Sequence, residues 1–162
     1  EMNREYFKGN EDNDYTMLKN FNNIVKLFDN VERCSEKNVI DATAIRNDKS
    51  FNIELKMRYV DINKYDSIFI EPNKVSVLLL DYLTKGIIPL YINFFQTENT
   101  IAIWNLARIT TYGYNPSVRI NDLGYETYKN ESRILLYTRD ACIYTRDNNE
   151  EPYKLIKPSY LQ

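Results

Sequence analysis

Three charged residues on two neighbouring stretches of the sequence could act together in metal or acid–base chemistry. Asp41 belongs to VIDATAIR (39–46), and Glu54 and Lys56 belong to FNIELKMRYV (51–60). Polar and apolar residues alternate strictly through most of the second stretch, which is the pattern of a strand with one buried face and one polar face. The two stretches are predicted to form a β-hairpin that carries all three residues on its polar face.

The predicted turn of this hairpin is NDKS (47–50). This turn places Asp41 opposite Lys56 and diagonal to Glu54, so that their Cβ atoms are about 5–8 Å apart. The same register gathers the apolar side chains and two small alanines on the other face, where a helix can approach. One register therefore satisfies both faces of the hairpin.

Two carboxylates at this separation can share a divalent cation. Mg²⁺ prefers oxygen ligands, uses one or two carboxylates and completes its coordination with water and phosphate oxygens. The carbonyl oxygen of Leu55 is a candidate third ligand, beside Asp41 and Glu54. Lys56 projects from the same face as Glu54, where it could activate or orient a water molecule or neutralise a phosphate.

Composition restricts the remaining chemistry. The chain has 162 residues and no histidine, which excludes Ser-His-Asp and Cys-His catalysis as well as histidine-ligated zinc. Two cysteines, Cys34 and Cys142, imply no disulfide framework, and a cytoplasmic location is the simpler expectation. The net charge of −2 does not by itself indicate nucleic-acid binding, and no apolar run is long enough to cross a membrane.

The elements that must position these residues follow from helical and alternating patterns. Apolar residues at helical spacing predict a first helix, and Pro72 and Gly86 delimit a second one. SIFIE (67–71) is expected to be a connector, and SRILLYTRDACIYTRDN to be one or two strands that turn near Arg139 and Asp140. The predicted elements are a helix over about 13–30, the hairpin, a helix over about 72–85, and strands over 88–95 and 100–109. This order predicts an α/β or α+β fold with helices on a central sheet.

Asp41, thirteen residues before the triplet Glu54-Leu55-Lys56, resembles the D…(D/E)xK signature of the PD-(D/E)xK nuclease superfamily. That superfamily includes type II restriction enzymes and Holliday-junction resolvases. The resemblance implies a restriction-endonuclease-like αβββαβ core, with a central mixed sheet flanked by helices, over about residues 13–110. A β-rich C-terminal extension, about 111–162, would complete a single domain of residues 1–162.

The resemblance also implies an activity, a cofactor and a substrate. Asp41 and Glu54 would be metal ligands for Mg²⁺ or Mn²⁺, Lys56 the catalytic lysine, and DNA the substrate. Members of the superfamily often dimerise, so a homodimer is a further expectation. The sequence departs from the pattern at Ile40, where many members have proline, and it lacks the Q-x-x-x-Y helix motif.

Other candidate site residues flank the triplet. Arg58 and Lys74 are expected to contact the phosphate backbone of a nucleic acid. Some branches of the superfamily place a further acid on the first helix, for which the sequence offers Glu11, Asp12 and Asp14 without choosing among them. The alternative function is a non-catalytic structural or protein-interaction module, of a phage or mobile element for instance, in which the charged hairpin face is only solvated.

Overall fold

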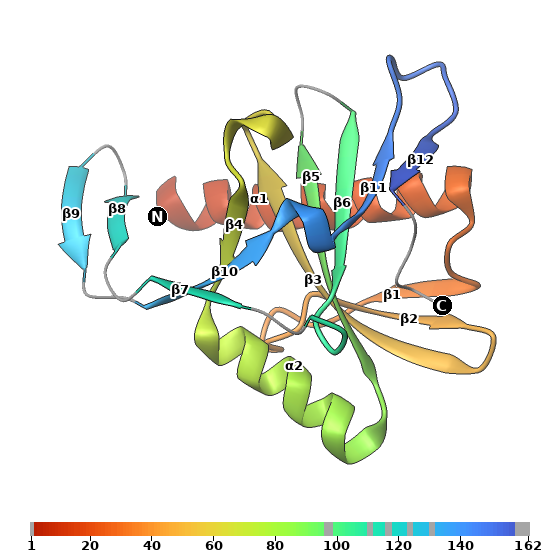
Figure 1. Ribbon diagram of the computed structural model, residues 1–162, viewed down its shortest axis with the longest axis horizontal. Coiled ribbons are helices and arrows are strands. Elements are labelled where there is room, and N and C mark those ends of the chain that lie inside the picture. Colours follow the sequence, from red (N-terminus) through yellow and green to blue (C-terminus); the bar gives the residue numbers. More distant parts are fainter. Residues whose placement is uncertain are drawn as a thin grey trace.

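The computed structural model describes residues 2–95, 99–109, 112–115, 118–122, 125–129 and 132–157, with side chains from Asn13 to Tyr114 and from Ser132 to Ile156 within those ranges (Figure 1). Its α-helices are α1 (Met2–Val25) and α2 (Pro72–Lys85), and short 3₁₀ turns cover Ile62–Lys64 and Thr138–Asp140. The strands are β1 (Asn30–Arg33), β2 (Ala42–Arg46), β3 (Lys49–Arg58), β4 (Ser67–Ile70), β5 (Ile88–Phe95), β6 (Thr100–Asn105), β7 (Gly113–Asn115), β8 (Val118–Asp122), β9 (Tyr125–Lys129), β10 (Arg133–Tyr137), β11 (Cys142–Thr145) and β12 (Lys154–Lys157).

A seven-stranded mixed sheet lies at the centre of the described structure, in the order β1-β2-β3-β5-β6-β11-β12. Strands β3 and β5 are parallel and are connected through β4 and α2, whereas the other neighbouring pairs are antiparallel. Strands β4, β10 and β7 form a second sheet, and β8 pairs with β9. The predicted mixed α/β class, with helices against a central sheet, is confirmed.

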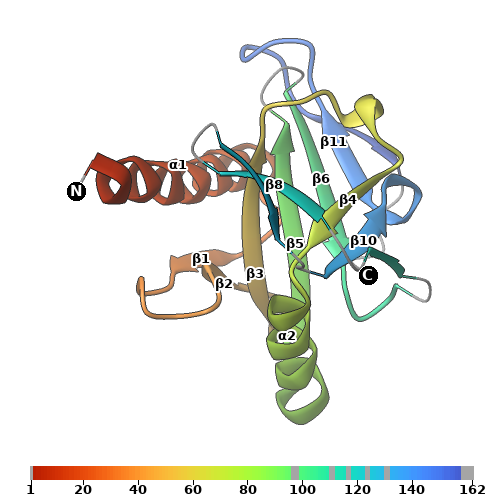
Figure 2. The same cartoon turned by 90° about the vertical axis from the view of Figure 1, so that its left-hand side faces the viewer.

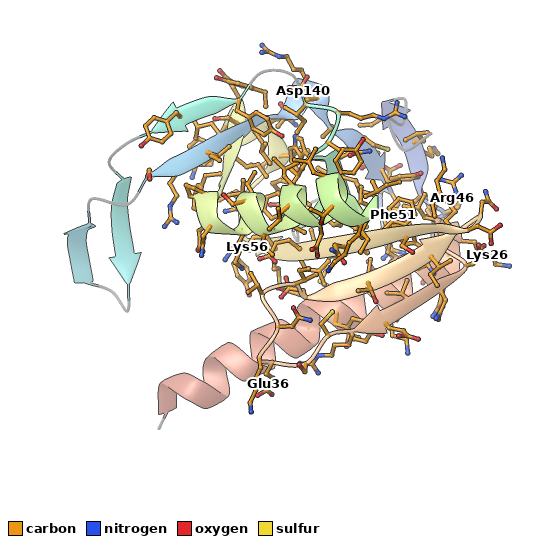
Figure 3. The ribbon with its side chains drawn as sticks, turned by 90° about the horizontal axis from the view of Figure 1, so that it is seen from below. Lys26, Glu36, Arg46, Phe51, Lys56 and Asp140 are labelled. Atoms are coloured by element: carbon orange, nitrogen blue, oxygen red, sulfur yellow. The ribbon has the colours of Figure 1, made fainter. Side chains whose placement is uncertain are left out.

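The two faces of the central sheet bury separate hydrophobic cores. Alternate residues of a strand point to opposite faces, and along β5 Leu90 and Ile92 pack on the side of α1, whereas Tyr91 and Phe95 pack on the side of α2. Figures 2 and 3 show the two helices on different sides of the sheet. A strand that is buried on both faces explains the continuous apolar run of β5.

Helix α2 has the bounds that its sequence predicts. Pro72 occupies its first turn, where the missing N–H is not needed. Gly86 ends it with a φ of 70°, in the left-handed region that glycine adopts without strain. The Gly86 N–H donates to the carbonyl oxygen of Tyr82 at 2.9 Å, which satisfies a helix-end acceptor.

Helix α1 starts earlier and ends earlier than predicted, at Met2 and Val25 instead of about 13 and 30. Lys26 has a φ of 53°, which breaks the helix. The side chain of Asn22 then fixes the exit, because its Oδ1 accepts from the Phe28 N–H at 2.8 Å and its Nδ2 donates to the Phe28 oxygen at 3.1 Å. Residues Asn30–Arg33 then form β1, a strand that the helical spacing of the apolar residues did not predict.

The predicted register of the β2–β3 hairpin is wrong by two residues. The turn consists of Asn47 and Asp48 alone, with φ of 47° and 62°, and Ala42 pairs with Ile53. Positive φ at both turn positions suits the right-handed twist of a tight hairpin. A shift of two residues leaves each side chain on its predicted face, but it brings Asp41 level with Glu54 instead of Lys56.

Outside the hairpin, two further expectations are corrected. The segment SIFI, expected to be a connector, forms β4, which pairs with β10. Strands β10 and β11 do not form a hairpin, because β10 joins the second sheet and β11 pairs with β6 in the central one. The stretch TTYGYNPSVRINDLG (110–124), whose Gly, Pro and Asn residues favour loops, also contains β7 and β8 within its described residues. Its residues 110–111, 116–117 and 123–124 lie outside the described ones. No helix within the described ranges is long and apolar enough to span a membrane.

Candidate active site

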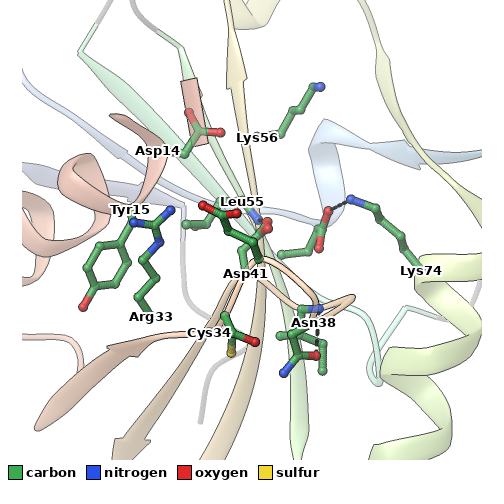
Figure 4. Close-up of a pocket in the computed structure, with 13 residues that line it drawn as sticks. Asp14, Tyr15, Arg33, Cys34, Asn38, Asp41, Leu55, Lys56 and Lys74 are labelled. Atoms are coloured by element: carbon green, nitrogen blue, oxygen red, sulfur yellow. Dashed lines mark hydrogen bonds and ion pairs between the residues drawn. The ribbon is translucent and has the colours of Figure 1, made fainter. Parts of the chain in front are cut away.

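The three residues of the predicted constellation line one pocket of about 280 Å³ between α1 and α2. Figure 4 shows Asp41 and Leu55 at its centre, Asp14 entering from α1 and Lys74 from α2. The full lining is Asp14, Tyr15, Arg33, Cys34, Ser35, Glu36, Asn38, Ile40, Asp41, Glu54, Leu55, Lys56 and Lys74. The acids therefore converge on one concave site instead of separating onto two faces.

Hydrogen bonds fix Asp41 immediately before Ala42, the first residue of β2. Its N–H donates to the Ile53 oxygen at 3.2 Å, and its carbonyl oxygen accepts from the Cys34 N–H at 2.9 Å. Its carboxylate Oδ2 accepts from the Leu55 N–H at 2.8 Å. This last bond holds the Asp41 carboxylate against the backbone of Leu55, the residue that follows Glu54. The Leu55 side chain itself packs into the core on the α1 side.

Glu54 is a buried carboxylate on the face of β3 that α2 covers. The residue is 4% exposed, and its Oε1 forms an ion pair with the Lys74 ammonium, shown by a dashed line in Figure 4. Its Oε2 is also buried and accepts no hydrogen bond from the described residues. An isolated buried charge is costly, so Glu54 needs a positive partner.

The protonation of Glu54 reflects this environment. Burial and the nearby Asp41 carboxylate raise the pKa of Glu54 to about 7, although Lys74 acts in the opposite direction. Burial of the Lys74 ammonium acts to lower its pKa, but Glu54, together with the more distant charges of Asp41 and Glu71, outweighs burial, so the pKa of Lys74 is raised. The pair is therefore an ammonium and a carboxylate at mildly alkaline pH.

Lys56 lies in the pocket but does not contact either acid by a hydrogen bond or ion pair among the described residues. In Figure 4 its ammonium points away from Asp41. The pKa of Lys56 is lowered, first by partial burial and then by the positive charges of Arg58 and Lys74. The lysine in contact with Glu54 is thus Lys74, whereas the sequence had assigned Lys74 to the nucleic-acid backbone.

Arg58 lies beyond Lys56 on the same strand, beside a smaller hollow of about 40 Å³. Its Nε donates to Asn93 Oδ1 at 2.8 Å, and one terminal nitrogen donates to the Tyr91 hydroxyl and the Phe69 carbonyl oxygen, each at 3.0 Å. Its guanidinium also stacks 4.8 Å from the Phe69 ring centroid. Arg58 is therefore held rigidly, with part of its charge facing the hollow.

Among the candidate acids of the first helix, Asp14 lines the pocket, and the side chains of Glu11 and Asp12 lie outside those described. The pocket also contains Arg33 and Cys34, neither of which the sequence placed at the site. Burial, with the Asp41 and Glu32 charges, raises the pKa of the Cys34 thiol. Arg33 is the last residue of β1 and Cys34 follows it. A correct prediction of β1 would have placed both residues near Asp41.

The donor set fits a hard divalent cation with few protein ligands. Within the described part of the chain, no group of three or more His, Cys, Asp and Glu residues could hold a metal ion. Asp41 and Glu54 provide two carboxylates, and Glu54 Oε2 is a buried oxygen that lacks a donor. Mg²⁺ needs only one or two carboxylates because it retains water, so this pair is sufficient.

Comparisons of the chain with protein-family models, with curated proteins and with solved structures found no match.

Proposed function

We propose that the protein is a Mg²⁺- or Mn²⁺-dependent nuclease of the PD-(D/E)xK type that hydrolyses phosphodiester bonds in DNA. The observation that carries the proposal is the pocket in which Asp41 and the buried Glu54 meet, with Lys56 on the same wall. Burial first, and then the charge of the nearby Asp41 carboxylate, raise the pKa of Glu54, which supports two acids close enough to interact.

The order of elements supports the same proposal. Helix α1, strands β1 to β3, helix α2 and strand β5 follow one another as in the αβββαβ core of that superfamily, apart from β4, which joins another sheet. The first acid precedes the second strand of this series, and the Glu-Leu-Lys triplet lies on the third. Parallel pairing of β3 with β5 places α2 over the triplet.

Asp41 and Glu54 would hold the cation, which would stabilise negative charge on the phosphate and make water more acidic when bound. Lys56 would take a proton from the attacking water, because its lowered pKa increases the fraction of neutral amine near neutral pH. The water oxygen forms the new bond to phosphorus, the bond to the leaving oxygen breaks, and that oxygen leaves with a proton from solvent. Arg58 would contribute positive charge beside a phosphate bound near Lys56.

A cleavage assay tests the proposal directly. Supercoiled plasmid, linear duplex, branched DNA and single-stranded RNA are each incubated with the wild type and Mg²⁺ or Mn²⁺. We expect DNA cleavage that EDTA abolishes and that Glu54→Gln or Lys56→Ala lowers by about a hundredfold or more. Lys49→Ala, on the far end of the same strand, and Glu150→Gln, on an exposed turn, are matched controls that should retain the wild-type rate.

Two results would contradict the proposal. One is an absence of metal-dependent cleavage of every substrate by a wild type whose circular dichroism shows a folded protein. The other is a wild-type rate in Glu54→Gln, because a neutral amide cannot replace the charged metal ligand.

The alternative of a non-catalytic interaction module is favoured by one specific observation, the ion pair that already neutralises Glu54. Exposed Leu80 and Leu83 on α2 would then serve as contact residues. This alternative predicts no cleavage and no metal binding, so the same assay separates the two functions. The hairpin face assumed for it is solvated only in part, because Asn52 and Glu54 are buried whereas Asp41 and Thr43 are partly exposed.

A further inference from the structure

We propose that Lys74 is a second catalytic lysine that exchanges partners during the reaction. In the metal-free protein the Lys74 ammonium forms an ion pair with the Glu54 carboxylate. When a divalent cation binds that carboxylate, the ion pair breaks and the Lys74 ammonium contacts the phosphate of the substrate. This inference rests on the proposed nuclease function and assigns a role to a residue outside the Asp-Glu-Lys signature.

Asp41 and Glu54 bring two carboxylates together, and the only ammonium in contact with Glu54 among the described residues is that of Lys74. A buried carboxylate with one oxygen lacking a donor requires a nearby positive charge. The Lys74 ammonium supplies this charge in the absence of metal, so it lies at the carboxylate that a metal ion would bind.

The Lys74 side chain is 32% exposed, compared with 5% for Glu54, so its ammonium has a route to solvent. Helix α2 itself is anchored, because Pro72 begins it and the Asn52 amide donates to Asp81 Oδ2 at 2.9 Å. The flexible stem of a lysine can therefore swing while the helix stays in place.

Lys74 lines both the main pocket and the smaller hollow beside Arg58, and only Glu54 and Lys56 share this position with it. A phosphate that approached Lys56 would therefore lie within reach of Lys74 as well. Freed from Glu54, the ammonium would stabilise charge that develops on the phosphate oxygens.

A purely structural ion pair makes different predictions. If Lys74 only stabilised the fold, replacing it would leave a buried carboxylate unpaired, reduce stability, and not improve metal binding. Partner exchange requires instead that the ammonium and the metal compete for one carboxylate. Removing the ammonium should then strengthen metal binding and weaken catalysis, two effects of opposite direction.

The test uses Lys74→Met, Lys74→Gln and Lys74→Arg, with Lys85→Met as the matched control on the last turn of the same helix. Lys85 forms an exposed ion pair with Asp81 and lies outside both hollows. Mn²⁺ binding is measured by calorimetry without DNA under anaerobic conditions as the pH is raised from about 7, and affinities are compared where they no longer rise with pH, because removing Lys74 takes away a charge that lowers the pKa of Glu54. Turnover is measured separately at saturating metal and DNA. Lys74→Gln retains a donor for Glu54, so it serves if Lys74→Met does not fold.

We expect Lys74→Met and Lys74→Gln to bind Mn²⁺ about tenfold more tightly, which corresponds to the loss of one charge-assisted hydrogen bond. Their kcat should fall about tenfold or more, Lys74→Arg should recover most of it, and Lys85→Met should match the wild type. Unchanged or weaker Mn²⁺ binding in the neutral variants would overturn the exchange, as would tighter binding with unchanged kcat. If the wild type binds Mn²⁺ and cleaves while the Lys74 variants behave like Lys85→Met, the exchange fails and the nuclease function stands. A wild type that neither binds nor cleaves refutes both.

Discussion

The buried Glu54 carboxylate should make the metal-free protein less stable as the pH rises from about 4.5 to about 7. Its pKa is raised from 4.5 to about 7 in the folded protein. The folded state therefore holds the proton more tightly than the unfolded state, and the free energy of unfolding falls across this window. Below pH 4.5 both states are protonated, and above pH 7 both are ionised, so the effect is confined to the interval between them.

The magnitude follows from the two pKa values. Each pKa unit corresponds to about 1.4 kcal/mol, so the change from 4.5 to about 7 amounts to about 3 kcal/mol. This is a large part of the stability of a small domain, which is about 5–15 kcal/mol. The side chain is only 5% exposed, so solvent does little to screen the effect.

Urea unfolding of the wild type and of Glu54→Gln at a series of pH values isolates this contribution. Glutamine is neutral throughout, and the other titrating groups largely cancel in the difference between the two proteins. The wild type should lose about 3 kcal/mol relative to Glu54→Gln between pH 4.5 and 7.5. Saturating Mg²⁺ should restore about that amount to the wild type alone, since a ligand at a hundred times its Kd adds about 2.7 kcal/mol. A difference that stays constant with pH would refute the reasoning, because Glu54 would then titrate alike in both states.

Three further substitutions probe the site and its supports. Asp41→Asn keeps an acceptor for the Leu55 N–H but removes a charge that raises the Glu54 pKa, so the midpoint of the pH effect should move to lower pH in the same urea series. Gly86→Ala should lower the free energy of unfolding by about 1 kcal/mol, because φ is 70° and a new Cβ would meet no atom, which leaves only backbone strain; an unchanged melting temperature would contradict this. Ile92→Ala removes a fully buried side chain of the central strand and should destabilise by about 2–5 kcal/mol in chemical denaturation, with a smaller loss showing that the core closes around the vacancy.

Local signals in the sequence predicted the local elements well. Pro72 and Gly86 delimit α2 because each acts on the backbone at its own position. Alternation predicted β3 and the division of its side chains between two faces, and the convergence of Asp41 and Glu54 follows from that division. Those inferences depended on residues only a few positions apart.

Features that depend on distant pairing were missed. The two-residue turn at Asn47 and Asp48 and the longer predicted turn give the same faces, so the side-chain pattern could not choose between the two registers. Strand β1 is short and mostly exposed, and its sequence carries no clear period. The contact between Lys74 and Glu54 depends on the parallel pairing of β3 with β5, which no local pattern specifies.

The connection between β3 and β5 has a consequence for the order of folding. Strands β2 and β3 are joined by two residues, and a hairpin of this kind forms in about 1–10 μs. Strand β5 can join only after the chain has closed the long crossover through β4 and α2, and such non-local pairing is slow. Asp41 and Glu54 should therefore meet early, before α2 can dock its lysine on them. We expect an interval during folding in which the two carboxylates face each other without Lys74 as their counter-ion.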